Sequence, residues 1–403
     1  MPILPVSAWV LAGATSASGL GAGLVFPFLV LYLAEIRGLG AAVGGAVFSV
    51  GAATTFAVSF PGGWLADRFG VRRVYVLGRL LKAISSLVLA PAATPAVALA
   101  GGVLFGLGQA ATFTTLQSLL AISVPAEQRS VVFAVRHAGA NLGFGLGAVA
   151  GGLIVDLDEP ASFIAVLVLS AASEVVGAVA VLAAVPAERI PVESRTGGYG
   201  VLLRDPALLR LLAIDVVLLT VTAGQFDVVI PLAAVRLLGL GAGVVGFLMG
   251  FNTLVVVFSS LVVARLIVGP QRTRALALSA ALGALAWTLL LVADAAPLGV
   301  VALLFAMGTA QAVGESIEVP SVAGMVNDLA PDALRARYNA GHGLSFATAT
   351  AVGPAIAGLA AEMGALRGLL IGLAVTCGLV ALAALTLKDP DSSSAQAALR
   401  RRR

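Results

Sequence analysis

Uncharged runs of about 20 residues recur along this chain from end to end, with short polar breaks between them. A run of that length is long enough to cross the hydrocarbon core of a bilayer as one helix. Composition agrees, because soluble chains average about 45–50% apolar and about 25% charged residues, whereas this chain is 60% hydrophobic and 11% charged. The sequence therefore predicts an integral membrane protein without a separate soluble domain.

The requirement of about 20 apolar residues per span predicts an all-α fold with twelve transmembrane helices. The expected spans are 8–33, 41–64, 74–92, 97–123, 130–155, 161–185, 207–231, 241–267, 274–293, 297–326, 335–361 and 365–387. One long polar segment divides them into six and six. We expect an N-terminal six-helix bundle over 1–185, a central cytoplasmic linker over 186–206, a C-terminal six-helix bundle over 207–388 and a cytoplasmic tail over 389–403.

Basic residues are distributed unevenly between the polar breaks. If both termini are cytoplasmic, the outer breaks contain only Arg37, Arg236 and Arg367, and the other basic residues of the breaks lie inside. This asymmetry is the positive-inside pattern. We therefore expect a multi-pass protein of the cell inner membrane with both termini in the cytoplasm. The net charge of +4 then reflects topology, and we expect no nucleic-acid partner.

The chain also contains an internal repeat. Residues 38–45 resemble 239–246, and residues 125–153 resemble 331–359 at nearly the same offset. Two windows at almost one offset indicate a duplication. Since six spans per copy preserve orientation, the copies are expected to be parallel repeats about an axis along the membrane normal. The substrate site is then expected near mid-membrane between them.

A polar motif, G-G-W-L-A-D-R-F-G-V-R-R, occupies residues 62–73 between the second and third expected spans. Its glycines permit a tight reversal, and its arginines anchor the turn at the cytoplasmic face. At Gly63, Asp67, Arg68, Gly70 and Arg72 the sequence resembles the major facilitator superfamily, whose loop at this place reads G-x-x-x-D-R-x-G-R-R. The resemblance implies a gating loop that latches the two halves. The corresponding loop at 264–272 lacks the Asp, so a weaker latch is expected there.

A glycine pattern in the fifth expected span extends the resemblance to the bacterial drug:proton antiporters of that superfamily. Residues 143–152 read G-F-G-L-G-A-V-A-G-G, which is similar to the antiporter motif G-x-x-x-G-P-x-x-G-G with Ala148 in place of Pro. Small residues at this spacing also let helices pack closely, so packing alone explains part of the pattern. The resemblance implies a monomer that uses the proton gradient and needs no cofactor.

Ionisable residues inside spans are costly and are functional candidates for that reason. Asp227 lies on the seventh expected span and Glu315 on the tenth. Both settings resemble those of membrane-embedded carboxylates in proton-driven multidrug exporters, which implies that these acids bind protons and meet cationic drugs. Gln311, Glu315 and Glu318 are spaced i, i+4, i+7 and form one polar stripe on a helix. Burial there favours the neutral carboxyl that a proton carrier needs, although a structurally paired acid is the alternative.

Other polar residues of the spans are weaker candidates. Arg136 precedes Asn141 in a pattern R-x-x-x-x-N that recurs in the same antiporter group, but its depth also allows it to snorkel. Asp215 is a second acid of the seventh expected span. The neutral polar residues expected to line a cavity are Gln109, Gln117, Gln225, Asn252 and Gln311.

Lys82 on the third expected span and Glu174 on the sixth lie at similar predicted depths. A structural ion pair between them is the favoured interpretation, with Arg79 as the competing partner of Glu174. The chain has one cysteine, Cys377, and two histidines. We therefore expect neither a disulfide nor a metal site.

The leading hypothesis is secondary active efflux, in which protons moving down their gradient displace a small lipophilic, cationic drug by alternating access. The alternative is a proton-coupled importer of a specific neutral metabolite such as a sugar, which would need more hydroxyl- and amide-binding groups. A non-transporting receptor is less favoured. An enzyme is not expected, because the sequence lacks a Ser-His-Asp set and a phosphate-binding loop.

Overall fold

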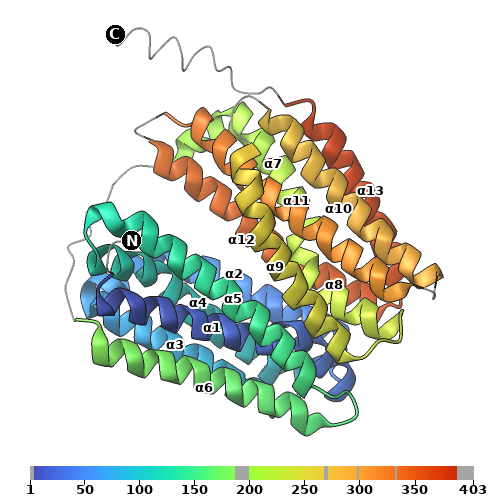
Figure 1. The fold of residues 1–403 in the computed structure, drawn as a ribbon, viewed down its shortest axis with the longest axis horizontal. Coiled ribbons are helices and arrows are strands. Elements are labelled where there is room, and N and C mark those ends of the chain that lie inside the picture. Colours follow the sequence, from blue (N-terminus) through green and yellow to red (C-terminus); the bar gives the residue numbers. More distant parts are fainter. Residues whose placement is uncertain (1–3, 187–198, 267–270, 297–298, 332–333, 388–403) are drawn as a thin grey trace. The chain divides into compact units, whose positions relative to one another are not determined.

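The computed structural model describes residues 4–186, 199–266, 271–296, 299–331 and 334–387. The described chain is almost entirely helical, with one isolated bridge between Asp156 and Glu159. The tail expected over 389–403 and most of the expected linker lie outside these residues. The α-helices, drawn in Figure 1, are α1 (Val6–Leu31), α2 (Ala41–Phe69), α3 (Val71–Leu89), α4 (Pro95–Ser123), α5 (Arg129–Ile154), α6 (Pro160–Ala184), α7 (Pro206–Val221), α8 (Ala223–Arg236), α9 (Ala242–Leu266), α10 (Arg272–Ala295), α11 (Val300–Leu329), α12 (Arg335–Glu362) and α13 (Leu366–Ala384). Short π or 3-10 turns are η1 (Tyr32–Ile36), η2 (Ala126–Gln128) and η3 (Tyr199–Arg204).

Ten helical stretches among the described residues are long and apolar enough to cross a membrane. The third and fifth expected spans, α3 and α5, are not among them. α3 carries Arg72, Arg73, Arg79 and Lys82 within its 19 residues, and α5 is rich in glycine. The all-helical, multi-span architecture is therefore confirmed. The count of twelve spans and the division into two six-helix repeats stay predictions.

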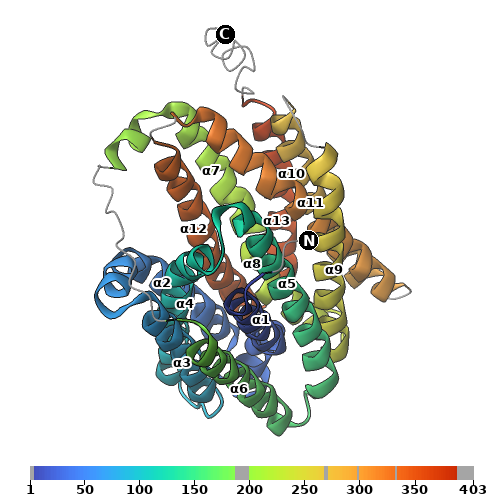
Figure 2. The same cartoon turned by 60° about the vertical axis from the view of Figure 1, so that its left-hand side comes forward.

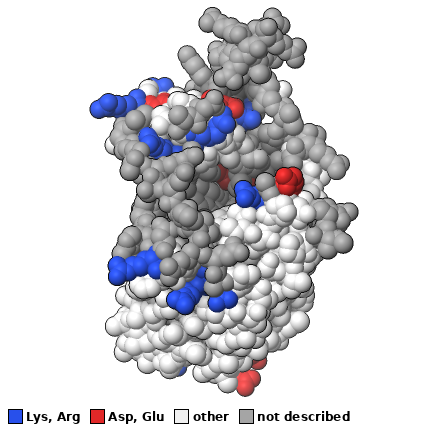
Figure 3. Space-filling view, turned by 90° about the vertical axis from the view of Figure 1, so that its left-hand side faces the viewer, with Lys and Arg blue, Asp and Glu red and all other residues white. Residues whose placement is uncertain are grey.

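The surface of the described helices is strongly apolar. Leu153, Val176, Phe258 and Leu382 are between 65% and 70% exposed. Most of the described surface in Figure 3 is uncharged, and the Lys and Arg side chains gather in a few groups on it. Large exposed aliphatic and aromatic side chains on many helices are what a lipid-facing surface requires.

The chain divides into two compact units, which we describe separately. Unit 1 comprises Met1–Ser194, Gln225–Leu254 and Ala351–Leu366, and unit 2 comprises Arg195–Gly224, Val255–Thr350 and Arg367–Arg403. Unit 1 therefore holds the expected N-terminal bundle together with α8, the first part of α9 and the last part of α12. The expected boundary at 186–206 stays a prediction.

Glycine-lined contacts bring the helices of unit 1 together. α1 packs against α5 and α6, α3 against α4 and α6, and α2 against α4, as Figures 1 and 2 show. Gly143 and Gly147 of the antiporter-like pattern lie against the backbone of α1, and Gly152 lies against Gly243 and Gly246 of α9. A side chain at these positions would collide with a neighbouring backbone, so small residues are needed for the close approach.

Polar contacts at one end of unit 1 tie the early helices to the late ones. Arg236 Nε of α8 lies 2.7 Å from Glu35 Oε1 of η1, and Arg236 Nη1 donates to the carbonyl of Ala361 at 2.9 Å. The Glu362 carboxylate of α12 accepts from the amide of Ala41 at 2.7 Å, at the N-terminus of α2. An anion is favoured there because the first amides of a helix have no partner within the helix. We call these contacts the unit 1 latch.

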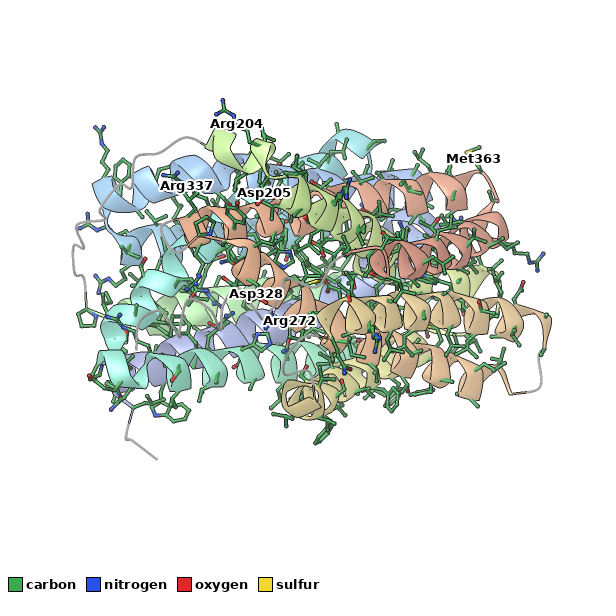
Figure 4. The ribbon with its side chains drawn as sticks, turned by 90° about the horizontal axis from the view of Figure 1, so that it is seen from above. Arg204, Asp205, Arg272, Asp328, Arg337 and Met363 are labelled. Carbon is green, nitrogen blue, oxygen red and sulfur yellow. The ribbon has the colours of Figure 1, made fainter. Side chains whose placement is uncertain are left out.

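Unit 2 is organised around α11. This helix packs against α10 and α7, and a buried cluster that includes Leu208, Leu276 and Val322 joins the three helices. At the ends of the unit, Arg272 pairs with Asp328, and the two side chains lie close together in Figure 4. Arg367 Nε pairs with Asp294 Oδ2 at 2.6 Å.

Candidate functional site

A break in the seventh expected span helps to form the site. One long helix was expected over 207–231, but the backbone at Thr222 has φ −119° and ψ −91°, so the span is divided into α7 and α8. The carbonyl of Val221, left at the break, accepts a hydrogen bond from Trp287 Nε1 at 2.7 Å. Irregular backbone inside a membrane protein is tolerated where such partners exist and where it lines a cavity. The break therefore lies beside the cavity of unit 2, which Thr222 and Ala223 help to line.

The N-terminal end of α7 is held by Asp205. At its start, Asp205 caps the helix by accepting from the amides of Ala207 and Leu208 at 3.0 and 3.1 Å. The other oxygen of Asp205 accepts from Tyr338 Oη of α12 at 2.7 Å. These contacts fix α7 relative to α12, the two helices that bring Asp215 and His342 together below.

A cavity of about 270 Å3 lies beside the break within unit 2. α11 supplies its polar side through Gln311, Glu315 and Glu318, the three residues of the predicted stripe. The rest of the wall is mainly apolar. The full lining is Leu219, Thr222, Ala223, Ser279, Gly283, Gln311, Gly314, Glu315, Glu318, Val319, His342, Gly343 and Phe346. Among these described lining residues none is Lys or Arg, so the cavity combines an apolar wall with acidic side chains.

Three titratable groups meet at the floor of this cavity. Asp215 of α7 is fully buried, and its Oδ2 lies 3.0 Å from Nδ1 of His342 on α12. The carboxyl group of Glu318 on α11 is 4% exposed and lies beside that of Asp215, close enough for a hydrogen bond once one of them carries a proton. Oδ1 of Asp215 and Oε1 of Glu318 are buried without a hydrogen-bond partner. The arrangement therefore can hold protons between its members.

The other predicted acid, Asp227, lies on α8 in unit 1, whereas Glu315 lies in unit 2. Arg136 of α5 is half-buried in unit 1, with Nε buried and unpaired. The neutral residues Gln109 and Gln117 of α4, together with Gln225 and Asn252, also belong to unit 1. Of the predicted site residues, the structure thus brings together Asp215, Gln311, Glu315 and Glu318.

The predicted gating loop is a turn between two helices of unit 1. Gly70 separates α2 from α3 with φ +90°, a conformation that favours glycine. Arg72 donates from Nη1 to the carbonyl of Val185 at 2.7 Å, at the C-terminal end of α6, and Arg68 lies over the ring of Phe69. Gly63 and Asp67 lie on α2, but their side chains are outside the described set. The latching role of this loop stays a prediction.

The expected ion pair between α3 and α6 is present and is larger than expected. Lys82 Nζ lies 2.8 Å from Glu174 Oε1, and Arg79 Nη2 lies 3.0 Å from Glu174 Oε2. Ser18 of α1 donates to Glu174 and accepts from Lys82. Arg79 was considered a competing partner, and the structure shows that both cations bind the same carboxylate. Charge, geometry and burial make this cluster a structural tie between α1, α3 and α6.

His342 and Trp287 were missed as site residues. The sequence assigns His342 no role, and within the described residues no group of His, Cys, Asp and Glu is arranged to hold a metal ion. The sequence signal for His342 is weak, because its contact with Asp215 joins positions 127 residues apart. Trp287 belongs to no motif of the sequence, and its role is to bind the carbonyl at the helix break.

The family model described as "Major Facilitator Superfamily" matches this chain over residues 11–311 and 271–402. The chain is 29% identical over 136 residues to the Na(+), Li(+), K(+)/H(+) antiporter of Planococcus maritimus, covering 32% of each chain. It is 28% identical over 144 residues to the quinolone resistance protein NorA of Staphylococcus aureus, covering 36% of this chain and 37% of that protein. The chain therefore aligns with about a third of the length of these relatives.

Solved structures share the fold over nearly the whole chain. A POT family transporter in complex with 5-aminolevulinic acid gives a TM-score of 0.77 at 16% identity, covering 95% of this chain and 96% of that one. The nucleoside transporter NupG gives 0.78 at 14% identity, covering 95% and 99%. A bacterial homologue of the human lysosomal transporter Spinster gives 0.75 at 13% identity, covering 94% and 97%. At these identities the likeness concerns the fold alone.

Proposed function

The chain belongs to the major facilitator superfamily, and we propose that it exports lipophilic cations across the cell membrane in exchange for protons. The observation that carries the proposal is the cavity of unit 2, which joins an apolar wall to Glu315 and Glu318 without a described Lys or Arg in its lining. Such a lining attracts a ligand that is both apolar and positively charged. Apart from Glu315, Glu318 and His342, the described lining offers a neutral sugar the polar side chains of Thr222, Ser279 and Gln311 alone.

The exchange follows from competition between two kinds of positive charge. A lipophilic cation that enters the cavity is stabilised by the acidic side chains when they are ionised. Proton binding removes that negative charge, so the cation is released. A carrier in which proton and cation exclude each other moves them in opposite directions when the cavity opens alternately to the two sides of the membrane.

The partial likeness to two relatives supports the same conclusion. One is described as a cation/H(+) antiporter and the other as a quinolone resistance protein. On the predicted orientation the unit 1 latch lies on the outer side, because Arg236 belongs to an outer break. In this proposal the latch breaks whenever the carrier opens outward, and residues 62–73 act at the opposite, cytoplasmic side.

Transport in proteoliposomes tests the proposal. We expect an imposed proton gradient to drive the movement of a fluorescent lipophilic cation by the wild-type protein. The double variant Asp227→Asn/Glu315→Gln should abolish this movement, whereas Asp158→Asn, which changes an exposed acid, should leave it intact. A wild-type protein that moves no cation under any gradient would contradict cation export and would favour import of a neutral metabolite. Cation movement that survives the double variant would contradict the role of these two acids.

A further inference from the structure

We propose that Asp215, Glu318 and His342 together form the site that binds the exchanged protons, while Glu315 faces the cation. The three residues come from α7, α11 and α12 of unit 2, and their side chains meet at the floor of the cavity. Glu318 and His342 line the cavity, whereas Asp215 is fully buried behind it. The inference rests on the proposed exchange of cations for protons and assigns the proton to particular groups.

The two carboxyl groups of the cluster are short of hydrogen-bond donors. An ionised carboxylate only accepts hydrogen bonds, and two adjacent carboxylates in a low-dielectric environment cannot both be charged without a compensating cation. Oδ1 of Asp215 and Oε1 of Glu318 are both buried and lack a partner. A single proton held between the two groups supplies a hydrogen-bond donor and removes one negative charge. The pair is therefore built to hold one proton.

The imidazole of His342 lies between the buried acid and the cavity. Nδ1 of His342 lies 3.0 Å from Oδ2 of Asp215, and the His342 side chain is 22% exposed. The ring is thus in contact both with the buried acid and with the cavity. When it is protonated, its positive charge lies beside the carboxyl pair, where opposite charges attract each other.

The charges of the three groups then balance in two states. With a proton shared by the carboxyl pair and a second on His342, the cluster is neutral. Loss of one proton leaves one negative charge, which a monovalent cation in the cavity can offset. The released proton leaves through Glu318 or His342, because these two groups, and not Asp215, line the cavity.

The described residues around Asp215, Glu318 and His342 offer few other places for an exchanged proton. The further titratable residue facing the cluster within the described part of unit 2 is Glu315, one turn earlier on α11. From α10 the cavity receives Ser279 and Gly283, which do not titrate. The charged pairs of this unit, Arg272 with Asp328 and Arg367 with Asp294, join helix ends and are not in the lining.

Two assays on the same proteoliposomes test the inference. The first measures exchange of labelled tetraphenylphosphonium without a pH gradient, which needs no net proton movement. The second measures its accumulation against a gradient of its own, driven by a pH gradient. In Asp215→Asn and Glu318→Gln, we expect accumulation to fall by about tenfold or more relative to exchange, a coupling of ordinary size. Asp294→Asn is the matched control, because this acid of unit 2 is bound by Arg367. This variant should lower neither exchange nor accumulation.

The role of the imidazole has its own readout. His342→Asn keeps a side-chain donor near Asp215 but cannot bind a proton at neutral pH. We expect the pH dependence of cation exchange to become less steep in this variant, because one of two titrating groups is removed. An unchanged pH dependence would overturn the assignment of His342.

The outcomes separate the inference from the proposed function. If the wild-type protein accumulates no cation, the proposed function fails. If the wild type accumulates cation and folded Asp215→Asn and Glu318→Gln variants do so equally well, the proton site proposed here is wrong. Folded variants that lose exchange and accumulation in equal measure would also overturn it, because they would show a role in cation binding or structure. A monodisperse elution profile in detergent identifies the folded variants.

Discussion

Glu174 in unit 1 and Glu318 in unit 2 are both carboxyl groups buried among membrane helices, but their partners differ. Glu174 is bound by Lys82 and Arg79 at 2.8 and 3.0 Å. Glu318 lies beside a second acid, Asp215. A carboxylate held by two cations has its charge compensated, whereas two neighbouring acids leave room for a shared proton in the exchange proposed above. Burial alone therefore does not make a membrane acid a proton carrier, because its partners decide.

The largest effect, a loss of stability, is expected when the buried ion cluster of Arg79, Lys82 and Glu174 is broken. Removing one partner of a buried ion pair costs about 3–5 kcal/mol, because it leaves an uncompensated buried charge. We expect Glu174→Ala to lower the thermal unfolding temperature of the purified protein strongly. In a double-mutant cycle with Lys82→Ala, the double variant should lose less stability than the two single variants combined.

The result that would contradict this part of the comparison is additivity. If Lys82→Ala and Glu174→Ala destabilise the protein independently, the pair is not coupled. The control cycle combines Glu174→Ala with Arg274→Ala, an exposed arginine of α10, and should be additive.

A substitution can give the acid cluster of unit 2 a fixed positive partner, like the one that Glu174 has in unit 1. His342→Lys places a permanent cation beside Asp215, much as Lys82 lies beside Glu174. We expect gradient-driven accumulation of the cation to fall by about tenfold or more, since the permanent charge of the lysine would take the place of an exchangeable proton on His342. The unfolding temperature should stay close to that of the wild type. Unimpaired accumulation in a folded His342→Lys protein would show that partner charge does not control proton exchange here.

The smallest effect is expected at the unit 1 latch, where the ion pair is partly exposed. The side chains of Arg236 and Glu35 are 29% and 33% exposed, and pairs of this kind contribute about 1 kcal/mol or less. We expect Arg236→Gln to shift the population towards an open latch by about fivefold or less. Spin labels at Asp158→Cys and Met363→Cys, in a Cys377→Ala background, should report a larger fraction of long distances.

A matched control for the latch is Arg210→Gln, an exposed arginine of α7. It should leave the distance distribution unchanged. A distribution that is identical in Arg236→Gln and the wild type would mean that the glycine contacts between α5 and α9 hold this end without help from the charges.

Much of the fold could be predicted from apolar run length, because each span needs a similar number of apolar residues. The polar stripe of Gln311, Glu315 and Glu318 was also accessible, since three positions at helical spacing share one face. The break at Thr222 could not be predicted, because Trp287, which binds the carbonyl at the break, lies on another helix.

The site could be predicted only in part, because the sequence does not show which side chains pair in the folded protein. Lys82 and Glu174 could be paired from depth alone, but depth could not show that Arg79 binds the same carboxylate. Asp215 and His342 are separated by 127 residues, and neither carries a motif that points to the other. Periodicity locates a residue on its own helix, whereas its electrostatic environment depends on how three helices pack.

The most direct test of the account measures protons released when a cation binds. Purified protein in detergent, in a weakly buffered solution with a pH indicator, is mixed with tetraphenylphosphonium while cation binding is followed in parallel. We predict that the wild type releases protons as the cation binds and that Asp215→Asn and Glu318→Gln release fewer, because cation and proton compete for one acidic cluster. Cation binding to the wild type without proton release would contradict the central claim.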